Sequence, residues 1–329
     1  MNSNPKEPRS LGWQVTVPAT SANLGCAFDC AGLALRLYLK ASFVPSDASE
    51  LTVEYQGPHA IRVPLDSTNL ALAALRFAAA SLGGPSPRGH VVLQNDIPVG
   101  AGLGSSAAAV IAGLLLGASY GADRVGMPEP EKLIGWAQEM EGHFDNAAAA
   151  LRGGLVFGWN DSGRIGTMKT AFPEHLKLIL VVPDAMVRTS EARRALPQSY
   201  SQSDALHNLQ RAAMLAASCF SGRFDFSPEM FDDRLHQPYR QELVPGIARC
   251  LRYRHPDLRG IAISGSGPSI IAIAQQKEDR IALDLQAIFA GEGVASETIV
   301  TSADNQGASI APCPAPVPQF ANAARGVKL

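Results

Sequence analysis

The sequence predicts a globular protein of about two domains that contains both strands and helices. The chain has 329 residues, which is more than one domain usually holds. Hydrophobic residues make up 46% of it and charged residues 18%, so a large core can form. Short apolar runs with strand-like alternation are interspersed with longer runs rich in alanine and leucine, which are typical of helices.

The first half of the chain is predicted to hold several short strands and helices. Residues 13–17 alternate between apolar and polar side chains, as a half-buried strand does. Asn69 precedes an Ala- and Leu-rich run, so we expect it to open a helix over residues 70–81. Further strands are expected at residues 33–41, 51–55, 61–64 and 90–95, and further helices after residue 106 and at residues 129–142.

The second half begins after a turn-rich stretch, residues 159–163, which we expect to mark the domain boundary. A buried strand at residues 176–182 and a helix at residues 204–220 follow. Residues 260–274 are predicted to form a strand, a glycine turn and a strand, and residues 297–302 a last strand. The predicted helix at residues 204–220 carries an apolar stripe that we expect to face the core: Leu206, Leu209, Ala213, Ala216 and Phe220.

These elements predict four segments along the chain. Residues 1–12 are expected to be disordered, residues 13–165 to form the first domain and residues 166–311 the second. The tail, residues 312–329, is rich in proline and is expected to be disordered or loosely packed.

Charge and cysteine content narrow the kind of protein. A net charge of −2 without a Lys/Arg tract gives no reason to expect nucleic acid or an anionic membrane as partner, so small ligands are favoured. No apolar run reaches the roughly 20 residues that span a bilayer, and we expect a cytoplasmic protein. The odd number and scattered spacing of the cysteines predict reduced thiols at Cys26, Cys30, Cys219, Cys250 and Cys313.

A glycine-rich loop, residues 98–109, has the clearest chemistry. Glycines at alternate positions let backbone N–H groups approach a ligand without a Cβ in the way. Two serines then lead into a helix, whose N-terminus attracts an anion. The spacing fits neither a Walker loop nor the dinucleotide fingerprint. We therefore expect a phosphate site here, with a tight turn that caps a buried helix as the alternative.

Polar residues outside this loop are weaker candidates when each is taken alone. Asn23 and Asp29 lie in a loop of small residues, where turn formation is the simplest role. Carboxylates on an exposed helix, such as those at positions 139 and 141, usually face water. The His143-x-Asp145 pair could suggest a transition-metal site, but no third nitrogen or sulfur ligand lies at a plausible local spacing.

Four stretches resemble motifs of a known family. Residues 98–107, Pro-Val-Gly-Ala-Gly-Leu-Gly-Ser-Ser-Ala, resemble the ATP-binding motif of the GHMP small-molecule kinases. Residues 18–29, Pro-Ala-Thr-Ser-Ala-Asn-Leu-Gly-Cys-Ala-Phe-Asp, resemble the N-terminal signature of homoserine kinases. Residues 141–154 are similar to a second homoserine kinase pattern, and residues 260–274 to the third GHMP motif. The resemblance covers residues 15–310.

The departures from the family pattern concern the rigidity of loops more than their chemistry. Asn23 and Asp29, which contact the amino-acid substrate in the family, are kept. Five positions differ from the family pattern. Cys26 and Ala27 stand where the family usually has Pro-Gly, Cys30 where Ser is common, and Phe144 and Ala149 where the family has proline.

The resemblance implies an α+β fold with two domains, a ribosomal-S5-like N-terminal ATP-binding domain and a ferredoxin-like C-terminal domain. It implies ATP-dependent phosphorylation of the side-chain hydroxyl of L-homoserine, giving O-phospho-L-homoserine for threonine synthesis. The implied cofactors are ATP and Mg²⁺, and the implied partners are L-homoserine and ATP. The oligomeric state stays open, with a homodimer as one option.

The resemblance also implies roles for individual residues. Asp145, Asn146 and Glu141 take catalytic positions, and Asp145 is either a general base or an orienting group. Ser106 and Glu141 are expected to hold Mg²⁺; Glu139 is the alternative, because residues two apart on a helix cannot face the same point. For the substrate, Asn23, Asp29 and His143 contact the amino end, Arg193 and Arg240 bind the carboxylate as two planar forks, and Thr189 fills a matching position. For ATP, the expected residues are Asn69, Pro98, Gly100, Gly102, Leu103, Gly104, Ser105, Ser106 and Ala107.

Two other interpretations stay open from the sequence. A different GHMP kinase, acting on a sugar or an isoprenoid alcohol, would share the glycine loops but gives no reason for the paired arginines. A non-catalytic regulator with the same fold would be expected to have lost Ser106, Glu141 or Asp145, and all three are present.

Overall fold

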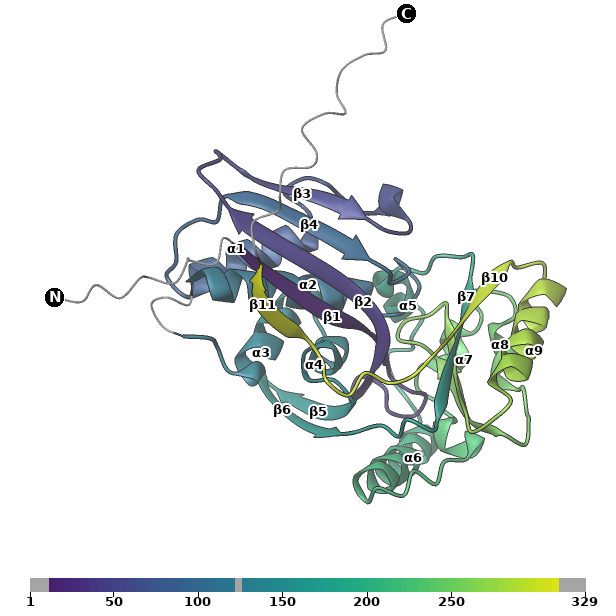
Figure 1. Cartoon of the computed structure of the whole chain (residues 1–329). Coiled ribbons are helices and arrows are strands. Elements are labelled where there is room, and N and C mark those ends of the chain that lie inside the picture. Colours follow the sequence, from purple (N-terminus) through teal and green to yellow (C-terminus); the bar gives the residue numbers. More distant parts are fainter. Residues whose placement is uncertain (1–11, 122–125, 314–329) are drawn as a thin grey trace, which may run out of the picture.

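The computed structural model describes residues 12–121 and 126–313, which form two sheets with helices packed against them (Figure 1). The first sheet has the strand order β11-β1-β2-β4-β3, and the β5–β6 hairpin joins it through β2. Its neighbouring strands are antiparallel, except for the parallel pair β3 and β4. The strands are β1 (Gly12–Ala22), β2 (Ala31–Pro45), β3 (Leu51–Gln56), β4 (Gly89–Asn95), β5 (Leu155–Asp161), β6 (Arg164–Thr170) and β11 (Ser309–Cys313).

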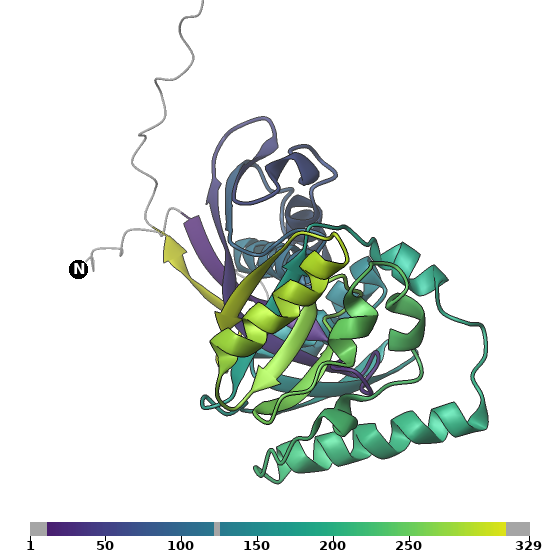
Figure 2. The same cartoon turned by 90° about the vertical axis from the view of Figure 1, so that its right-hand side faces the viewer.

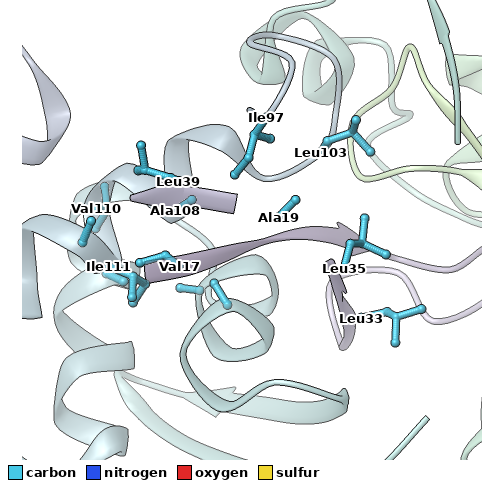
Figure 3. Close-up of a cluster of buried hydrophobic side chains, with 14 of the residues drawn as sticks. Val17, Ala19, Leu33, Leu35, Leu39, Ile97, Leu103, Ala108, Val110 and Ile111 are labelled. Carbon is cyan, nitrogen blue, oxygen red and sulfur yellow. The ribbon is translucent and has the colours of Figure 1, made fainter. Parts of the chain in front are cut away.

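Four helices accompany this sheet, and the core between them positions the glycine-rich loop. The helices are α1 (Leu70–Ser81), α2 (Ser105–Gly121), α3 (Pro130–Glu141) and α4 (Asp145–Arg152). Figure 3 shows Val17 of β1 and Val110 and Ile111 of α2 in one buried cluster, to which Leu103 of the loop also belongs. Because α2 starts directly after the loop, burial of its apolar side chains holds the end of the loop in place.

The second sheet is antiparallel and has the strand order β10-β7-β9-β8. Numbered along the chain, this order is 4-1-3-2 with a helical connection after the first and third strands, so the expected ferredoxin-like domain is confirmed. Its strands are β7 (Lys177–Pro183), β8 (Leu258–Ile263), β9 (Ile270–Ala274) and β10 (Ser296–Thr301). Its helices are α5 (Thr189–Arg194), α6 (Gln202–Phe220), α7 (Gln237–Arg240), α8 (Ile247–Leu251) and α9 (Glu278–Gly291), with a 3-10 turn η2 (Pro228–Phe231).

Most elements predicted from periodicity are present. The helix at residues 70–81 has the predicted bounds, and β7 is the expected buried strand, with all but its first residue buried. Residues 61–64 are not a strand: Ala60–Arg62 form the 3-10 turn η1, and Ile61 is 99% exposed. A strand needs a neighbour to pair with, and this segment has none among the described residues.

The turn at residues 159–163 does not separate the sheets. It joins β5 to β6, which pair from Leu155 opposite Thr170 to Asp161 opposite Arg164. The expected boundary after residue 165 therefore falls inside β6, and the chain leaves the first sheet after Thr170. At the other end, β11 returns to pair with β1 and includes residues 312 and 313 of the expected tail. The rest of that tail and residues 1–11 lie outside the described residues.

The apolar stripe of α6 is exposed, so the interpretation of this stripe as core is wrong. Leu206 is 47% exposed and Leu209 64%, and the buried residues of α6 are Asn208, Leu215 and Cys219. Periodicity shows that a helix has an apolar face but not which way that face points.

Two other expectations bear on the kind of protein. Cys26, Cys30, Cys219 and Cys250 are reduced thiols, as predicted. Within residues 12–121 and 126–313, no helix combines the length and the hydropathy that a bilayer crossing requires.

Candidate active site

A cavity of about 360 Å³ brings together the predicted site residues from both halves of the chain. Asn23, Asp29 and the glycine-rich loop come from the first half, whereas Thr189, Arg193 and Arg240 come from the second. Two predicted residues do not line it: Ala107 is buried inside α2, and Glu141 lies beside Ser106. The predicted residues that line the cavity are Asn23, Asp29, Asn69, Pro98, Gly100, Gly102, Leu103, Gly104, Ser105, Ser106, His143, Asp145, Asn146, Thr189, Arg193 and Arg240.

The glycine-rich loop has the conformation that its sequence predicts. Gly100, Gly102 and Gly104 have φ angles of 76°, 77° and 69°, which favour glycine, and α2 begins at Ser105. The loop therefore sits at the N-terminus of a 17-residue helix, where unpaired N–H groups and the helix dipole attract an anion. This geometry supports a phosphate site more than a simple helix cap.

A second glycine turn, between β8 and β9, packs against the glycine-rich loop. Ser264 Oγ donates a hydrogen bond of 2.8 Å to the Gly102 carbonyl, and Ser269 N donates to the Ala101 carbonyl at 3.2 Å. A Cβ on Gly102 would collide with the carbonyls of Ser264 and Gly267, so the two turns pack backbone to backbone. The Ser264 contact itself was not predicted, although the residue lies in residues 260–274, the stretch that resembles the third GHMP motif.

Thr20 connects the loop to α4, and this contact makes a prediction about Gly104. Thr20 Oγ1 donates to Asn146 Oδ1 at 2.7 Å, and a Cβ on Gly104 would collide with Thr20 Oγ1. We expect Gly104→Ala to raise the KM for ATP and to lower the free energy of unfolding, measured in urea. Gly83→Ala is the matched control, because Gly83 has a φ of 68° but open space around it.

The control separates backbone strain from the collision. Gly83→Ala should cost only the left-handed strain of about 1–2 kcal/mol and leave the KM for ATP unchanged. Equal losses of stability in the two variants, with no change in KM, would show that the Thr20 contact is unimportant.

Ser106 and Glu141 form an oxygen-rich pair at the edge of the cavity. Burial raises the pKa of Glu141, and a hydrogen bond from Ser106 partly offsets this. Glu141 Oε2 is buried and has no hydrogen-bond partner, whereas Glu139, two residues earlier, is exposed. A hydroxyl beside a carboxylate with an unsatisfied oxygen suits a hard cation such as Mg²⁺. This arrangement favours Glu141 over Glu139 as a ligand.

Asp145 is the first residue of α4 and is only 3% exposed. Its Oδ1 accepts a hydrogen bond of 2.8 Å from Asn146 N and lies 3.2 Å from His143 Nδ1. The contact with Asp145 raises the pKa of His143, against the effect of burial. Among the described residues, no group of three or more His, Cys, Asp or Glu that could hold a metal ion is found.

Arg193 and Asp29 form an ion pair across the cavity. The Arg193 guanidinium donates to both Asp29 carboxylate oxygens, at 3.0 and 3.1 Å, and both side chains are 40% exposed. Asn23 holds the Asp29 loop in place, since its Oδ1 accepts from Asp29 N and its Nδ2 donates to the Gly265 carbonyl. Asp29 and Arg193 are expected to bind opposite ends of the amino-acid substrate, but here they contact each other.

Arg240 is buried and is held by residues that the sequence analysis missed. Its Nη1 donates to the Gly265 carbonyl at 3.1 Å and to His236 Nδ1 at 3.3 Å, and its guanidinium lies over the Phe28 ring. His236 Nε2 lies 2.9 Å from the Gly25 carbonyl, and burial lowers the pKa of His236, so a neutral ring donates at Nε2 and accepts at Nδ1. The sequence did hold one signal for this contact: His236 and Arg240 are four residues apart, a spacing that places two side chains on the same face of a helix.

Asn69 caps the N-terminus of α1, which is one of the two roles that the sequence predicts for it. Its Oδ1 accepts hydrogen bonds from Ala71 N and Leu72 N as the N-cap of α1, and its Nδ2 donates to the Pro64 carbonyl. It also lines the cavity, near Tyr55 and Asn95, two lining residues that were not predicted. The contact between Asn69 and ATP that the resemblance implies stays a prediction.

Comparison with known proteins gives consistent results. Residues 69–154 match the family model "GHMP kinases N terminal domain". The chain is 38% identical to the homoserine kinase of Solibacter usitatus, over 91% of this chain and 97% of that protein. It is 35% identical to the homoserine kinase of Carboxydothermus hydrogenoformans, over 89% of this chain and 95% of that protein.

Solved structures show the same likeness. The crystal structure of homoserine kinase from Cytophaga hutchinsonii superposes with a TM-score of 0.81 at 25% identity, covering 94% of this chain and all of that one. A mevalonate kinase structure superposes with a TM-score of 0.57 at 11% identity, over 89% of this chain, which shows a shared fold.

Proposed function

This chain belongs to the homoserine kinase family of GHMP kinases, and we propose that it transfers the γ-phosphoryl group of ATP to the side-chain hydroxyl of L-homoserine in the cavity described above. The product, O-phospho-L-homoserine, serves threonine biosynthesis. The observation that carries the proposal is the composition of the cavity: the phosphate-type loop shares it with Asp29, Arg193 and Arg240. The loop suits the phosphoanhydride chain of ATP. The aspartate and the arginines suit the two charged ends of a zwitterionic amino acid. We propose the cytoplasm as the site of this reaction.

The loop and the helix dipole support binding and polarisation of the ATP phosphates. During transfer, a bond forms between the homoserine oxygen and the γ-phosphorus, the bond to the β–γ bridging oxygen breaks, and the hydroxyl proton is released. Such reactions depend mainly on positioning and on charge neutralisation. We propose that Ser106 and Glu141 hold Mg²⁺, which when bound neutralises charge on the phosphates.

The substrate end of the cavity supports recognition of a zwitterion. We propose that the ammonium of homoserine pairs with Asp29 and its carboxylate with Arg193 and Arg240. Binding then replaces the single Asp29–Arg193 ion pair by two, so neither charged side chain loses its partner. His143 and the His236–Arg240 contact keep the surrounding groups in fixed positions.

The function is tested by ADP release over a panel of alcohols, with the product identified by phosphorus NMR. L-Homoserine should be the best acceptor. L-Serine has a shorter arm and L-threonine a secondary hydroxyl, so either would leave the reacting oxygen out of line with the γ-phosphate. Faster turnover of galactose, mevalonate or shikimate would contradict the substrate assignment and leave only the kinase fold.

We propose that Asp145 orients the substrate hydroxyl and is not an essential base. Its carboxylate accepts hydrogen bonds from Asn146 at the start of α4, and these hold it in place as an acceptor. Asp145→Asn should therefore keep more than about a tenth of the wild-type turnover, whereas loss of a true base costs roughly 10²- to 10⁴-fold. Single-turnover measurements of phosphoryl transfer check this. A loss of about 10³-fold would restore the role of general base.

A further inference from the structure

Arg240 keeps one edge of its guanidinium free of partners. The residue is only 3% exposed, and its Nη1 donates both to His236 Nδ1 and to the Gly265 carbonyl. Its Nε is buried without a hydrogen-bond partner, and no described residue accepts a hydrogen bond from its Nη2. Nε and Nη2 lie side by side in the guanidinium plane, so together they can bind both oxygens of one carboxylate.

The charge of Arg240, which lines the cavity, is also unpaired among residues 12–121 and 126–313. Asp29 pairs with Arg193 instead, and Asp233 accepts hydrogen bonds from Asn208 and from backbone N–H groups at the start of α7. Burial lowers the pKa of Arg240, and the nearby Asp29 partly offsets this. Because a buried cation without a partner is costly, the free edge and the unpaired charge both call for an anionic ligand.

His236 and Gly265 determine which edge of Arg240 stays free. An Nη nitrogen carries two hydrogens, and these two acceptors, at 3.3 and 3.1 Å, use both hydrogens of Nη1. Arg240 Cζ also lies over the Phe28 ring, 5.1 Å from its centroid. Nη1 is therefore tied to the protein, and the Nε–Nη2 edge is the one left for a ligand.

Three contacts hold the His236 ring in the orientation that this requires. Its Nε2 lies 2.9 Å from the Gly25 carbonyl, and its ring stacks on Phe28 with 4.9 Å between the centroids. Its backbone N donates to Asp233 Oδ2 at 2.9 Å. Gly25 and Phe28 belong to the loop after β1, whose purple trace reaches the green helices of the second half in Figures 1 and 2. The ring is thus fixed between the two halves of the chain.

The same contacts fix the position of the proton on the ring. Nε2 donates to the Gly25 carbonyl, so Nδ1 of the neutral ring carries the lone pair that accepts from Arg240. Burial lowers the pKa of His236; Asp233, whose Oδ2 lies 3.6 Å from Nε2, raises it, and Arg240 lowers it. A protonated ring would instead turn an N–H group toward a cation. The neutral tautomer is therefore the one that can hold Arg240.

We propose that His236 is a positioning residue for substrate binding: by holding Nη1 of Arg240, it directs the Nε–Nη2 edge to the carboxylate of the amino-acid substrate. This inference rests on the proposed function, in which Arg240 binds that carboxylate. His236 is fully buried and does not line the cavity, so it acts only through Arg240. Its loss should therefore weaken the binding of homoserine and leave the binding of ATP unchanged.

A matched pair of variants separates this role from a purely structural one. His236→Asn and His236→Leu both lose the donor to the Gly25 carbonyl, but the asparagine has an oxygen close to the Nδ1 position that can accept from Arg240. His236→Leu should raise the KM for L-homoserine by about tenfold, as the loss of one hydrogen bond to a charged group does. His236→Asn should restore most of this loss, and the KM for ATP should change in neither variant.

Gln237→Leu controls for the loss of buried polar contacts on α7. Gln237 bonds Phe231 and Ile263 but not Arg240, so this variant should unfold at a lower temperature and keep the wild-type KM for homoserine. Equal KM values for homoserine in His236→Asn and His236→Leu would overturn the proposal.

Nitrogen-15 NMR tests the free edge in the wild-type protein, whatever the stability of the His236 variants. The Arg240 Nε–H signal, assigned by its absence in Arg240→Lys, should move downfield when L-homoserine is added, since Nε gains a charged acceptor. An unmoved signal at saturating homoserine would overturn the proposal and leave the proposed function in place. A wild type that binds no homoserine would overturn both.

Discussion

Replacing Glu141 with alanine should lower the turnover number by about 10²-fold or more, and replacing Ser106 with alanine should do the same, while Glu139→Ala should stay close to wild type. The reason is the arrangement at the edge of the cavity, where Ser106 bonds Glu141 and the buried Glu141 Oε2 has no partner. In the proposed metal site, removing either oxygen would remove a group that holds the cation against the phosphates. Glu139 lies on the same helix and is exposed, so it controls for the loss of a nearby negative charge.

Steady-state kinetics over a range of Mg²⁺ concentration measure this result. Electron paramagnetic resonance of Mn²⁺ in the presence of ADP gives a second readout that does not depend on turnover. The damaged variants should bind Mn²⁺ more weakly, and Glu139→Ala should bind it as the wild type does. If Glu139→Ala were the inactive variant and Glu141→Ala the active one, the metal ligand would be Glu139.

Replacing Arg193 with alanine should raise the KM for L-homoserine by roughly 10- to 150-fold, because one charge-assisted hydrogen-bonded contact contributes ~1.5–3 kcal/mol. The KM for ATP should stay nearly unchanged. Arg193→Lys should not restore binding, since a point charge cannot replace the planar fork that now spans both Asp29 oxygens. Arg194→Ala is the matched control, because Arg194 is the next residue of α5 but does not line the cavity.

Arg240→Ala should raise the same KM, but it also removes a buried side chain that bonds Gly265 and His236. Its thermal unfolding must therefore be measured beside its kinetics. Arg193 gives the cleaner test because it is 40% exposed. Unchanged KM values for homoserine in both variants would contradict a carboxylate site formed by these arginines.

The Asp29–Arg193 ion pair also predicts how the enzyme discriminates between L-homoserine and a substrate without an ammonium group. 4-Hydroxybutyrate has the carboxylate and the hydroxyl of homoserine but lacks the ammonium. If it takes Arg193, it leaves Asp29 without a partner, so the wild type should use it poorly. Asp29→Asn removes that penalty and should narrow the difference in kcat/KM between homoserine and 4-hydroxybutyrate. An unchanged ratio would show that the ion pair does not discriminate between them.

The sequence by itself determined the parts of this protein that depend on local chemistry. Glycine adopts positive φ angles without a steric penalty, and Gly100, Gly102 and Gly104 do so, while the Ala-rich run after them forms α2. The helix at residues 70–81 and the buried strand β7 followed from periodicity and capping in the same way. Family motifs then predicted the fold and the residues that line the cavity.

Only the tertiary structure decided which predicted residues meet and which surfaces stay open. Glu141 and Glu139 are equivalent in sequence, but α3 turns only Glu141 toward Ser106. The Asp29–Arg193 pair joins residues 164 positions apart, and the His236–Arg240 contact depends on a fold that buries both. The stripe of α6 has the same period whether it faces the core or solvent, because periodicity is a property of the helix alone. Its direction is set by what α6 packs against: Leu215 and Cys219 join the hydrophobic core, and Asn208 bonds Asp233.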